Sequence, residues 1–205
     1  MSTFTLCVFN ETALSNGDFA QGLSDVKDSL AAVLADKKID VKIAAAPKNG
    51  RLTKNVMAQR PAGAKILCLV DDASRGIELA DLFALKLTAK QRNDALEPRV
   101  LGMGPIRRPA IFLWDFEVNG VRRYGDTFDA RLRGSCLHEL GHSFGLLHDT
   151  DAKGKERNDD LDLMVPAPNT RDPKAHYVAV DAAHVAVWAE VFVKNDKGGF
   201  HYISA

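Results

Sequence analysis

One segment near residue 140 constrains this chain more than any other, because residues 138–148 read His-Glu-Leu-Gly-His-Ser-Phe-Gly-Leu-Leu-His. On an α-helix His138 and His142 are about one turn apart, so both imidazoles leave the same face. Gly145 lets the chain leave the helix, because glycine tolerates the positive φ common at a helix end. The following turn can then bring His148 back toward the first two rings. The spacing H-E-x-x-H-x-x-G-x-x-H predicts one metal ion bound by three histidines, with Glu139 beside them.

Three imidazole ligands leave one coordination position open, whereas a structural zinc site is closed by four protein ligands. The segment therefore predicts one catalytic Zn²⁺, with His138, His142 and His148 as the metal ligands. Glu139 is then the catalytic residue, a general base that takes a proton from a metal-activated water. The bland alternative is a surface helix with scattered histidines. It is disfavoured because three of the six histidines of the chain fall inside this one motif.

Beyond the metal chemistry, residues 138–149 resemble the metzincin clan of zinc endopeptidases and are most similar to its matrixin-like members. In that clan a methionine-containing turn, the Met-turn, forms a hydrophobic floor beneath the three histidines. Met164, within Asp162-Leu-Met-Val-Pro166 and sixteen positions after His148, is the residue matched to it. The resemblance implies zinc-dependent hydrolysis of peptide bonds. For Met164 the alternative is an ordinary core methionine that fills a gap.

The periodicity of the first 90 residues predicts strands that alternate with helices. Strands are expected at 4–10, 39–46 and 65–70, and amphipathic helices at 18–35 and 76–87. The run at 65–70 is continuously apolar after Lys65 and is expected at the centre of a sheet. A β-α-β-x-β order favours parallel strands joined by crossover helices.

The fold class expected from these elements is α+β with an α/β-like N-terminal lobe. The resemblance adds a metzincin-like arrangement, in which a mixed, mostly parallel, twisted sheet ends in an antiparallel edge strand. We expect a single catalytic domain over 1–205. Its upper lobe, 1–145, holds the sheet, two or more large helices and the active-site helix from about Asp129 to Gly145. The lower lobe, 146–205, holds the third zinc ligand, the Met-turn and a terminal helix at 181–193.

Asn119-Gly120, between apolar runs at 110–118 and 121–124, is the strongest short hairpin signal in the chain. We expect this hairpin at the edge of the sheet above the cleft. In metzincins the edge strand pairs antiparallel with the substrate backbone, and residues 111–116 are matched to that strand. Packing of the same residues in the interior of a sheet is the alternative.

Acidic side chains are frequent between Asp149 and Asp162, and calcium is therefore a second cofactor to consider. Their spacing matches no known calcium loop, so a solvated loop is favoured. The three cysteines are widely separated and odd in number, which argues against a disulfide framework. Cys7 and Cys68 are expected as buried apolar residues. Cys136 is close enough to His138 to suggest a fourth ligand or a redox group, but an i to i+2 spacing places it on a different side of the helix, and burial is favoured.

Lys and Arg together number 27, as do Asp and Glu, so no net charge draws the chain to nucleic acid or to an anionic membrane. The expected partner is a protein or peptide substrate, with neither nucleic acid nor membrane, and the expected state is a monomer. The first ten residues lack the features of a signal peptide. A cytoplasmic location, or export without a cleaved signal, is expected. Since no prosegment resembling those of the clan is seen, restraint by a separate inhibitor protein is one option and activity as translated is the other.

Two other functions compete with peptide hydrolysis. A family of bacterial metal-dependent endoribonucleases spaces three histidines at the same intervals, but it differs at the position of Glu139 and offers no counterpart of Met164. A zinc-stabilised binding module without turnover is the second alternative, and such a module would not need Glu139. The presence of Glu139 and Met164 favours a zinc endopeptidase over both alternatives.

Overall fold

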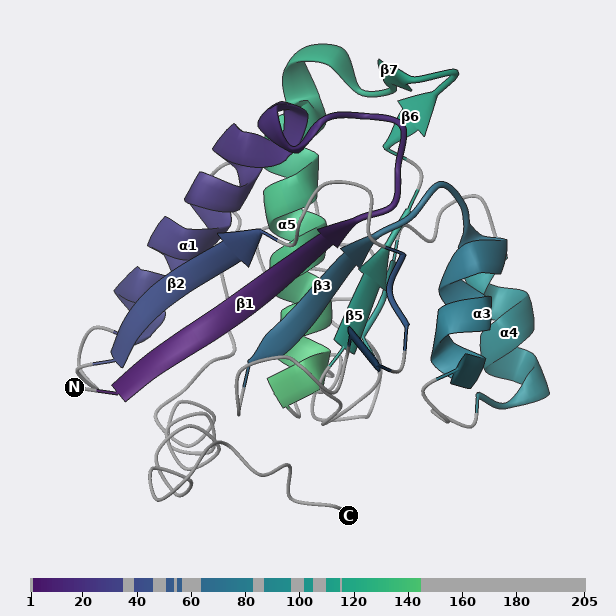
Figure 1. Cartoon of the computed structure of the whole chain (residues 1–205), viewed down its shortest axis with the longest axis horizontal. Coiled ribbons are helices and arrows are strands. Elements are labelled where there is room, and N and C mark those ends of the chain that lie inside the picture. Colours follow the sequence, from purple (N-terminus) through teal and green to yellow (C-terminus); the bar gives the residue numbers. More distant parts are fainter. Residues whose placement is uncertain are drawn as a thin grey trace, which may run out of the picture.

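A five-stranded sheet with helices on both faces organises the computed structural model (Figure 1). The structure describes residues 2–34, 39–45, 51–53, 55–56, 64–82, 87–96, 102–104, 110–114 and 116–144. The strands of the sheet are β1 (Ser2–Asn10), β2 (Ile39–Ala45), β3 (Lys65–Leu69), β4 (Gly102–Met103) and β5 (Ala110–Leu113).

The strands lie in the order β2-β1-β3-β5-β4. β1 pairs in parallel with both β2 and β3, and β3 pairs in parallel with β5. β4 alone among these pairings is antiparallel, and it lies at the edge beside β5. The α+β class, the mostly parallel sheet and the antiparallel edge strand predicted from the sequence are therefore confirmed.

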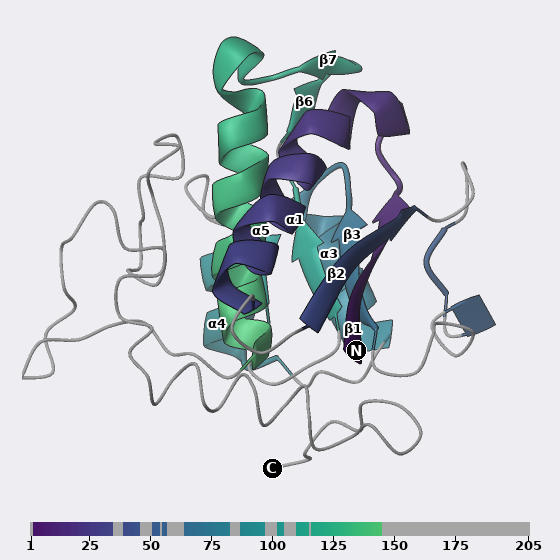
Figure 2. The same ribbon diagram turned by 90° about the vertical axis from the view of Figure 1, so that its left-hand side faces the viewer.

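One face of the sheet is covered by α1 (Ala20–Leu34) and α5 (Phe128–Phe144), which lie side by side (Figures 1 and 2). A short 3-10 helix, η1 (Asn16–Phe19), leads into α1. The two helices approach closely at Gly22, where an added Cβ would lie 2.8 Å from Cδ2 of Leu132. The Gly22 amide also donates to Oδ1 of Asp129 over 3.0 Å. The first turn of α5 is thereby fixed against α1.

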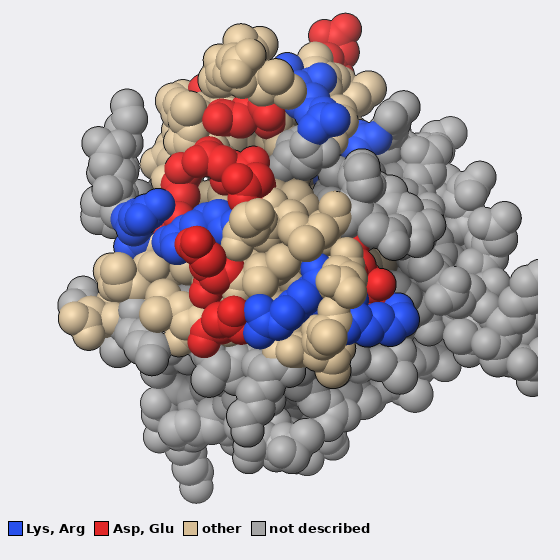
Figure 3. Space-filling model, turned by 90° about the vertical axis from the view of Figure 1, so that its right-hand side faces the viewer, with Lys and Arg blue, Asp and Glu red and all other residues tan. Residues whose placement is uncertain are grey.

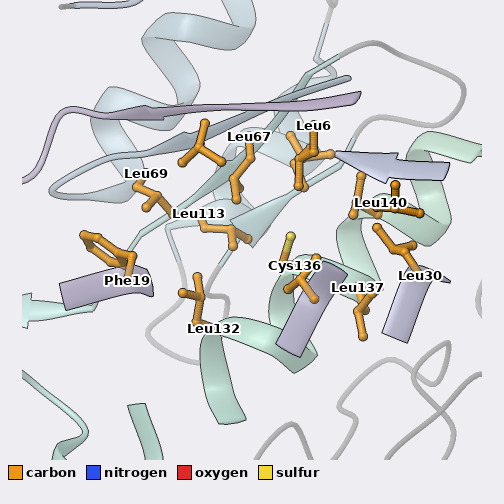
Figure 4. Close-up of a cluster of buried hydrophobic side chains, with 14 of the residues drawn as sticks. Leu6, Phe19, Leu30, Leu67, Leu69, Leu113, Leu132, Cys136, Leu137 and Leu140 are labelled. Atoms are coloured by element: carbon orange, nitrogen blue, oxygen red, sulfur yellow. The ribbon is translucent and has the colours of Figure 1, made fainter. Parts of the chain in front are cut away.

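The core between the sheet and these helices is built mainly of leucines, with Cys136 among them (Figure 4). Side chains alternate along a strand, so Leu67 and Leu69 of β3 face α1 and α5, while Ile66 and Cys68 face the other side. All five residues of β3 are buried. The prediction of a central strand buried on both faces is confirmed.

The opposite face of the sheet carries α3 (Ala73–Leu82) and α4 (Ala89–Ala95). α3 packs on the Trp114 ring, since a Cβ added at Gly76 would lie 2.8 Å from that ring. On the exposed side of these helices, basic and acidic side chains lie next to one another (Figure 3). The ion pairs Arg92–Asp81 and Lys90–Asp94 belong to this surface. The described part of this face carries no patch of one sign.

The predicted hairpin forms, but not where it was expected. β6 (Glu117–Val118) and β7 (Val121–Arg122) are joined by Asn119 at φ 52° and Gly120 at φ 77°. Positive φ at both positions is the signature of a type I′ turn. The hairpin forms its own two-stranded sheet, and the match of residues 111–116 to the edge strand is wrong. β5 lies between β3 and β4, because its four residues are all buried and suit an interior position.

Two elements differ from the sequence-based expectation. The helix expected at 76–87 is α3, which begins earlier and ends at Leu82, and α4 was not predicted. The lower lobe, Met164, the acidic stretch at 149–162 and the terminal helix expected at 181–193 lie outside the described residues. Within the described residues, no helix has the length and apolarity needed to cross a membrane.

Candidate metal centre and active site

The site is built on α5, which follows the hairpin through η3 (Gly125–Thr127). Its buried apolar side chains Leu132, Cys136, Leu140 and Phe144 recur every four residues and face the sheet and α1. The ring of Phe144 meets the ring of Phe4 from β1 edge to face, with the centroids 5.8 Å apart. The helix is thereby held along its whole length. The predicted active-site helix is confirmed within one or two residues at each end.

His138 and His142 lie one turn apart on α5 with their ring nitrogens facing each other. The two Nε2 atoms are 3.2 Å apart, and the ring planes are nearly perpendicular at 87°. His138 is buried at 8% exposure, whereas His142 is half-buried. The pair therefore sits where the protein interior opens to solvent.

This separation can be tested against the geometry of a metal ion. Two imidazole nitrogens about 2.0–2.1 Å from one tetrahedral zinc ion are about 3.3 Å apart. The observed 3.2 Å agrees with that value. The same distance fits an N–H···N hydrogen bond between two neutral rings, in which one Nε2 carries a proton. Metal binding would displace that proton, so the observed distance is compatible with the pair both with and without a metal ion.

Glu139 occupies the side of α5 that faces the edge strand. A Cβ added at Gly104, the residue after β4, would lie 2.2 Å from the carbonyl oxygen of Glu139, so only glycine fits there. Burial of the carboxyl group raises the pKa of Glu139 to about 8, and a hydrogen bond from the Gly104 backbone acts in the opposite direction. A cation bound at the neighbouring imidazoles would also favour the ionised carboxylate. Burial and a neighbouring cation would thus act on the pKa of Glu139 in opposite directions.

Cys136 does not belong to the site. Its side chain is fully buried in the leucine core between the sheet and α1 (Figure 4). Burial, with a smaller contribution from the charge of Glu139, raises the pKa of its thiol. A thiol is a metal ligand only as the thiolate, and burial disfavours that form here. The expectation of structural burial is confirmed, and so it is for Cys7 and Cys68.

The described residues place His138 and His142 side by side, and Glu139 lies on the same helix against Gly102 and Gly104. His148 and Met164 lie outside the described residues, and their roles stay predictions. Within the described residues, no three His, Cys, Asp or Glu side chains form a metal-binding group. Of the three predicted ligands, the structure therefore describes only the pair on α5.

Two residues next to the site were not predicted from the sequence. Gly104 lies against the backbone of Glu139, and Lys65 lies against the end of α5. The cluster Gly102-Met-Gly104-Pro105 carried a signal, because closely spaced glycines often mark a close backbone approach. Nothing local in the sequence indicates that Lys65 reaches α5.

Comparison with known proteins adds two structures of similar arrangement. Metalloproteinase-II from Bacteroides fragilis is 14% identical, with a TM-score of 0.48, and the match covers 92% of this chain and 53% of that one. Archaemetzincin from Archaeoglobus fulgidus is 13% identical, with a TM-score of 0.41, over 81% of this chain and 94% of that one. This chain thus spans about half the length of the Bacteroides protein. No protein-family model and no curated protein sequence matches it. At these low similarities the function has to be argued from the residues of this chain.

Proposed function

We propose that this chain is a zinc-dependent endopeptidase of metzincin type. The observation that supports it most directly is the 3.2 Å separation of the Nε2 atoms of His138 and His142 on a helix that also carries Glu139. His148 is the proposed third ligand, and Met164 is the proposed Met-turn residue. Two ring nitrogens at ligand spacing with a carboxylate between them in sequence are typical of a hydrolytic metal site.

A zinc ion held by these histidines would polarise the scissile carbonyl and lower the pKa of a water molecule. Glu139 accepts the proton of the attacking water and delivers it to the departing amine. The backbone N–H of Gly104 orients the carboxylate during both transfers.

The proposed substrate is a peptide in extended conformation that lies along β4. This strand is antiparallel and lies at the edge of the sheet, and Gly102 and the following Gly104 lie against Glu139. A substrate backbone added to such an edge would run beside the catalytic carboxylate. β4 takes this role in place of residues 111–116, because β5 is covered on both sides by β3 and β4.

The test compares cleavage of two substrates, each with and without a metal chelator. Purified protein is analysed for zinc and then incubated with casein and, separately, with structured RNA, with and without a chelator. We expect one zinc ion per chain, cleavage of casein, loss of cleavage with chelator and recovery when zinc is restored. Cleavage of RNA in place of casein would point to a metal-dependent nuclease. Zinc binding without cleavage of either would point to a binding module.

A further inference from the structure

Lys65 holds an unusual place in this fold. It is the first residue of β3, and strand alternation puts its side chain on the same face as Leu67 and Leu69, toward α5. It is only 2% exposed, and it is the one lysine or arginine classed as buried within the described chain. Burial of a cation costs free energy unless the charge is paired or hydrogen-bonded. The contacts of Lys65 must therefore do more than fill space.

The ammonium group of Lys65 reaches the last turn of α5. Its Nζ donates a hydrogen bond to the carbonyl oxygen of Ser143 over 2.7 Å and lies 5.1 Å from the centre of the Phe144 ring. The last four carbonyls of a helix have no partner within the helix. The negative end of the helix dipole lies at the same place and favours a cation. Lys65 therefore caps α5 where the helix ends.

The hydrogen bond from Lys65 lies next to a proposed zinc ligand. Ser143 directly follows His142, so the capped carbonyl lies one residue beyond a proposed zinc ligand. The helix ends at Phe144, four residues before His148. Fraying of this last turn would move the ring of His142 away from that of His138. Removal of a group that orients a metal ligand typically weakens metal binding about 10–100-fold.

We propose that Lys65 is a positioning residue for the metal site, which fixes the C-terminal turn of α5 and so keeps His142 at ligand distance from His138. This inference rests on the proposed zinc function. It assigns Lys65 no contact with substrate or metal. Its role is to set the affinity with which zinc is held.

The experiment measures zinc affinity by competition with a chromophoric chelator, in the wild type and three variants. Lys65→Met keeps the length of the side chain but removes the cation and its donors, and its zinc Kd is expected to rise about 10-fold or more. Lys65→Arg keeps a cation and donors and is expected to recover most of that loss. Lys42→Met is the matched control on β2, where the lysine side chain is 65% exposed, and wild-type affinity is expected.

Thermal unfolding of the zinc-free proteins separates positioning from stability alone. A Lys65→Met variant with a lower Tm but a wild-type zinc Kd would overturn the proposal, because Lys65 would then support the fold without shaping the site. If wild-type protein itself fails to bind zinc, the proposed function fails. Equal zinc affinity in wild type and Lys65→Met refutes only the role of Lys65.

Should Lys65→Met fail to fold by circular dichroism, hydrogen exchange of the zinc-free wild type supplies the test. Amides of residues 141–144 are expected to exchange as slowly as those of residues 136–140. Exchange faster by about tenfold or more at the end of α5 would show that the turn frays despite Lys65, and the proposal would be wrong.

Discussion

The face of the sheet under α1 and α5 and the face under α3 and α4 bury different kinds of side chain. Toward α5 the core contains five phenylalanines with leucines between them. Toward α3 it contains cysteines and alanines beside Phe9, Phe112 and Trp114. Large rings with few rotamers fix a helix more firmly than small side chains do. The helix with the histidine pair thus lies on the face whose core contains more aromatic rings.

The two faces also differ in where their charged side chains lie. On the α5 side Lys65 is buried and donates a hydrogen bond to the end of the helix. On the other side the pairs Arg92–Asp81 and Lys90–Asp94 lie at the surface, where solvent and salt weaken them, whereas Arg75 of α3 pairs with the largely buried carboxylate of Glu11. Changes on the α5 face should therefore alter the proposed metal site, and comparable changes on the α3 face should alter stability alone.

The largest expected effect comes from removing the proposed catalytic carboxylate of Glu139. Glu139→Ala should keep its zinc but lose peptidase activity by a factor of about 10²–10⁴, the usual contribution of a general acid–base group. Steady-state kinetics on casein measures the loss of activity, and metal analysis of the same samples measures the retained zinc. The matched change on α3, Glu78→Ala at an exposed position, should leave kcat/KM at the wild-type level. Near wild-type turnover by Glu139→Ala would remove Glu139 from the mechanism.

Two buried leucines, one from each face of the sheet, test whether packing affects zinc affinity on the α5 face alone. Leu140 of α5 and Leu79 of α3 are both fully buried, so each change to alanine should cost about 2–5 kcal/mol of unfolding free energy. Denaturant unfolding measures that cost. Only Leu140→Ala should also raise the zinc Kd, because the cavity lies under the turn that carries His138 and His142. Equal zinc affinity in both variants would break the proposed link between packing and site.

The smallest effect is expected at the surface pair Arg92–Asp81. A hydrogen bond and the charge of Arg92 lower the pKa of Asp81, so this carboxylate contributes stability above its ordinary value of 3.8 and loses it as the pH falls through the lowered value. Arg92→Ala should reduce Tm by about 1–2 °C at pH 7. The difference should vanish in strong acid, where Asp81 is protonated in folded and unfolded chains alike. A Tm difference that persists there would have another source.

Periodicity in the sequence was enough to predict β1, α1, β2 and β3, because each repeats its apolar residues with the period of its own structure. The motif around residue 140 predicted α5 and the facing histidines for the same local reason. α4 was missed although Thr88 and Gln91 form a capping box at its start, a signal that was present in the sequence.

The remaining features depend on partners distant in the chain. β4 has only two residues, and its pairing with β5 defines it. Asn119-Gly120 fixed the turn of the hairpin but not the surface on which the hairpin lies, and the predicted edge position was wrong. The bond from Lys65 to Ser143 joins residues 78 positions apart. Short-range patterns carry no information about such contacts.

The central claim is that Nε2 of His138 and Nε2 of His142 bind one zinc ion, and anomalous diffraction at the zinc edge tests it most directly. Crystals of zinc-loaded protein should give a single strong peak about 2.0–2.1 Å from both atoms. The distance between the two nitrogens should stay close to 3.2 Å. A peak elsewhere on the chain, or rings that point apart in the loaded protein, would contradict the account.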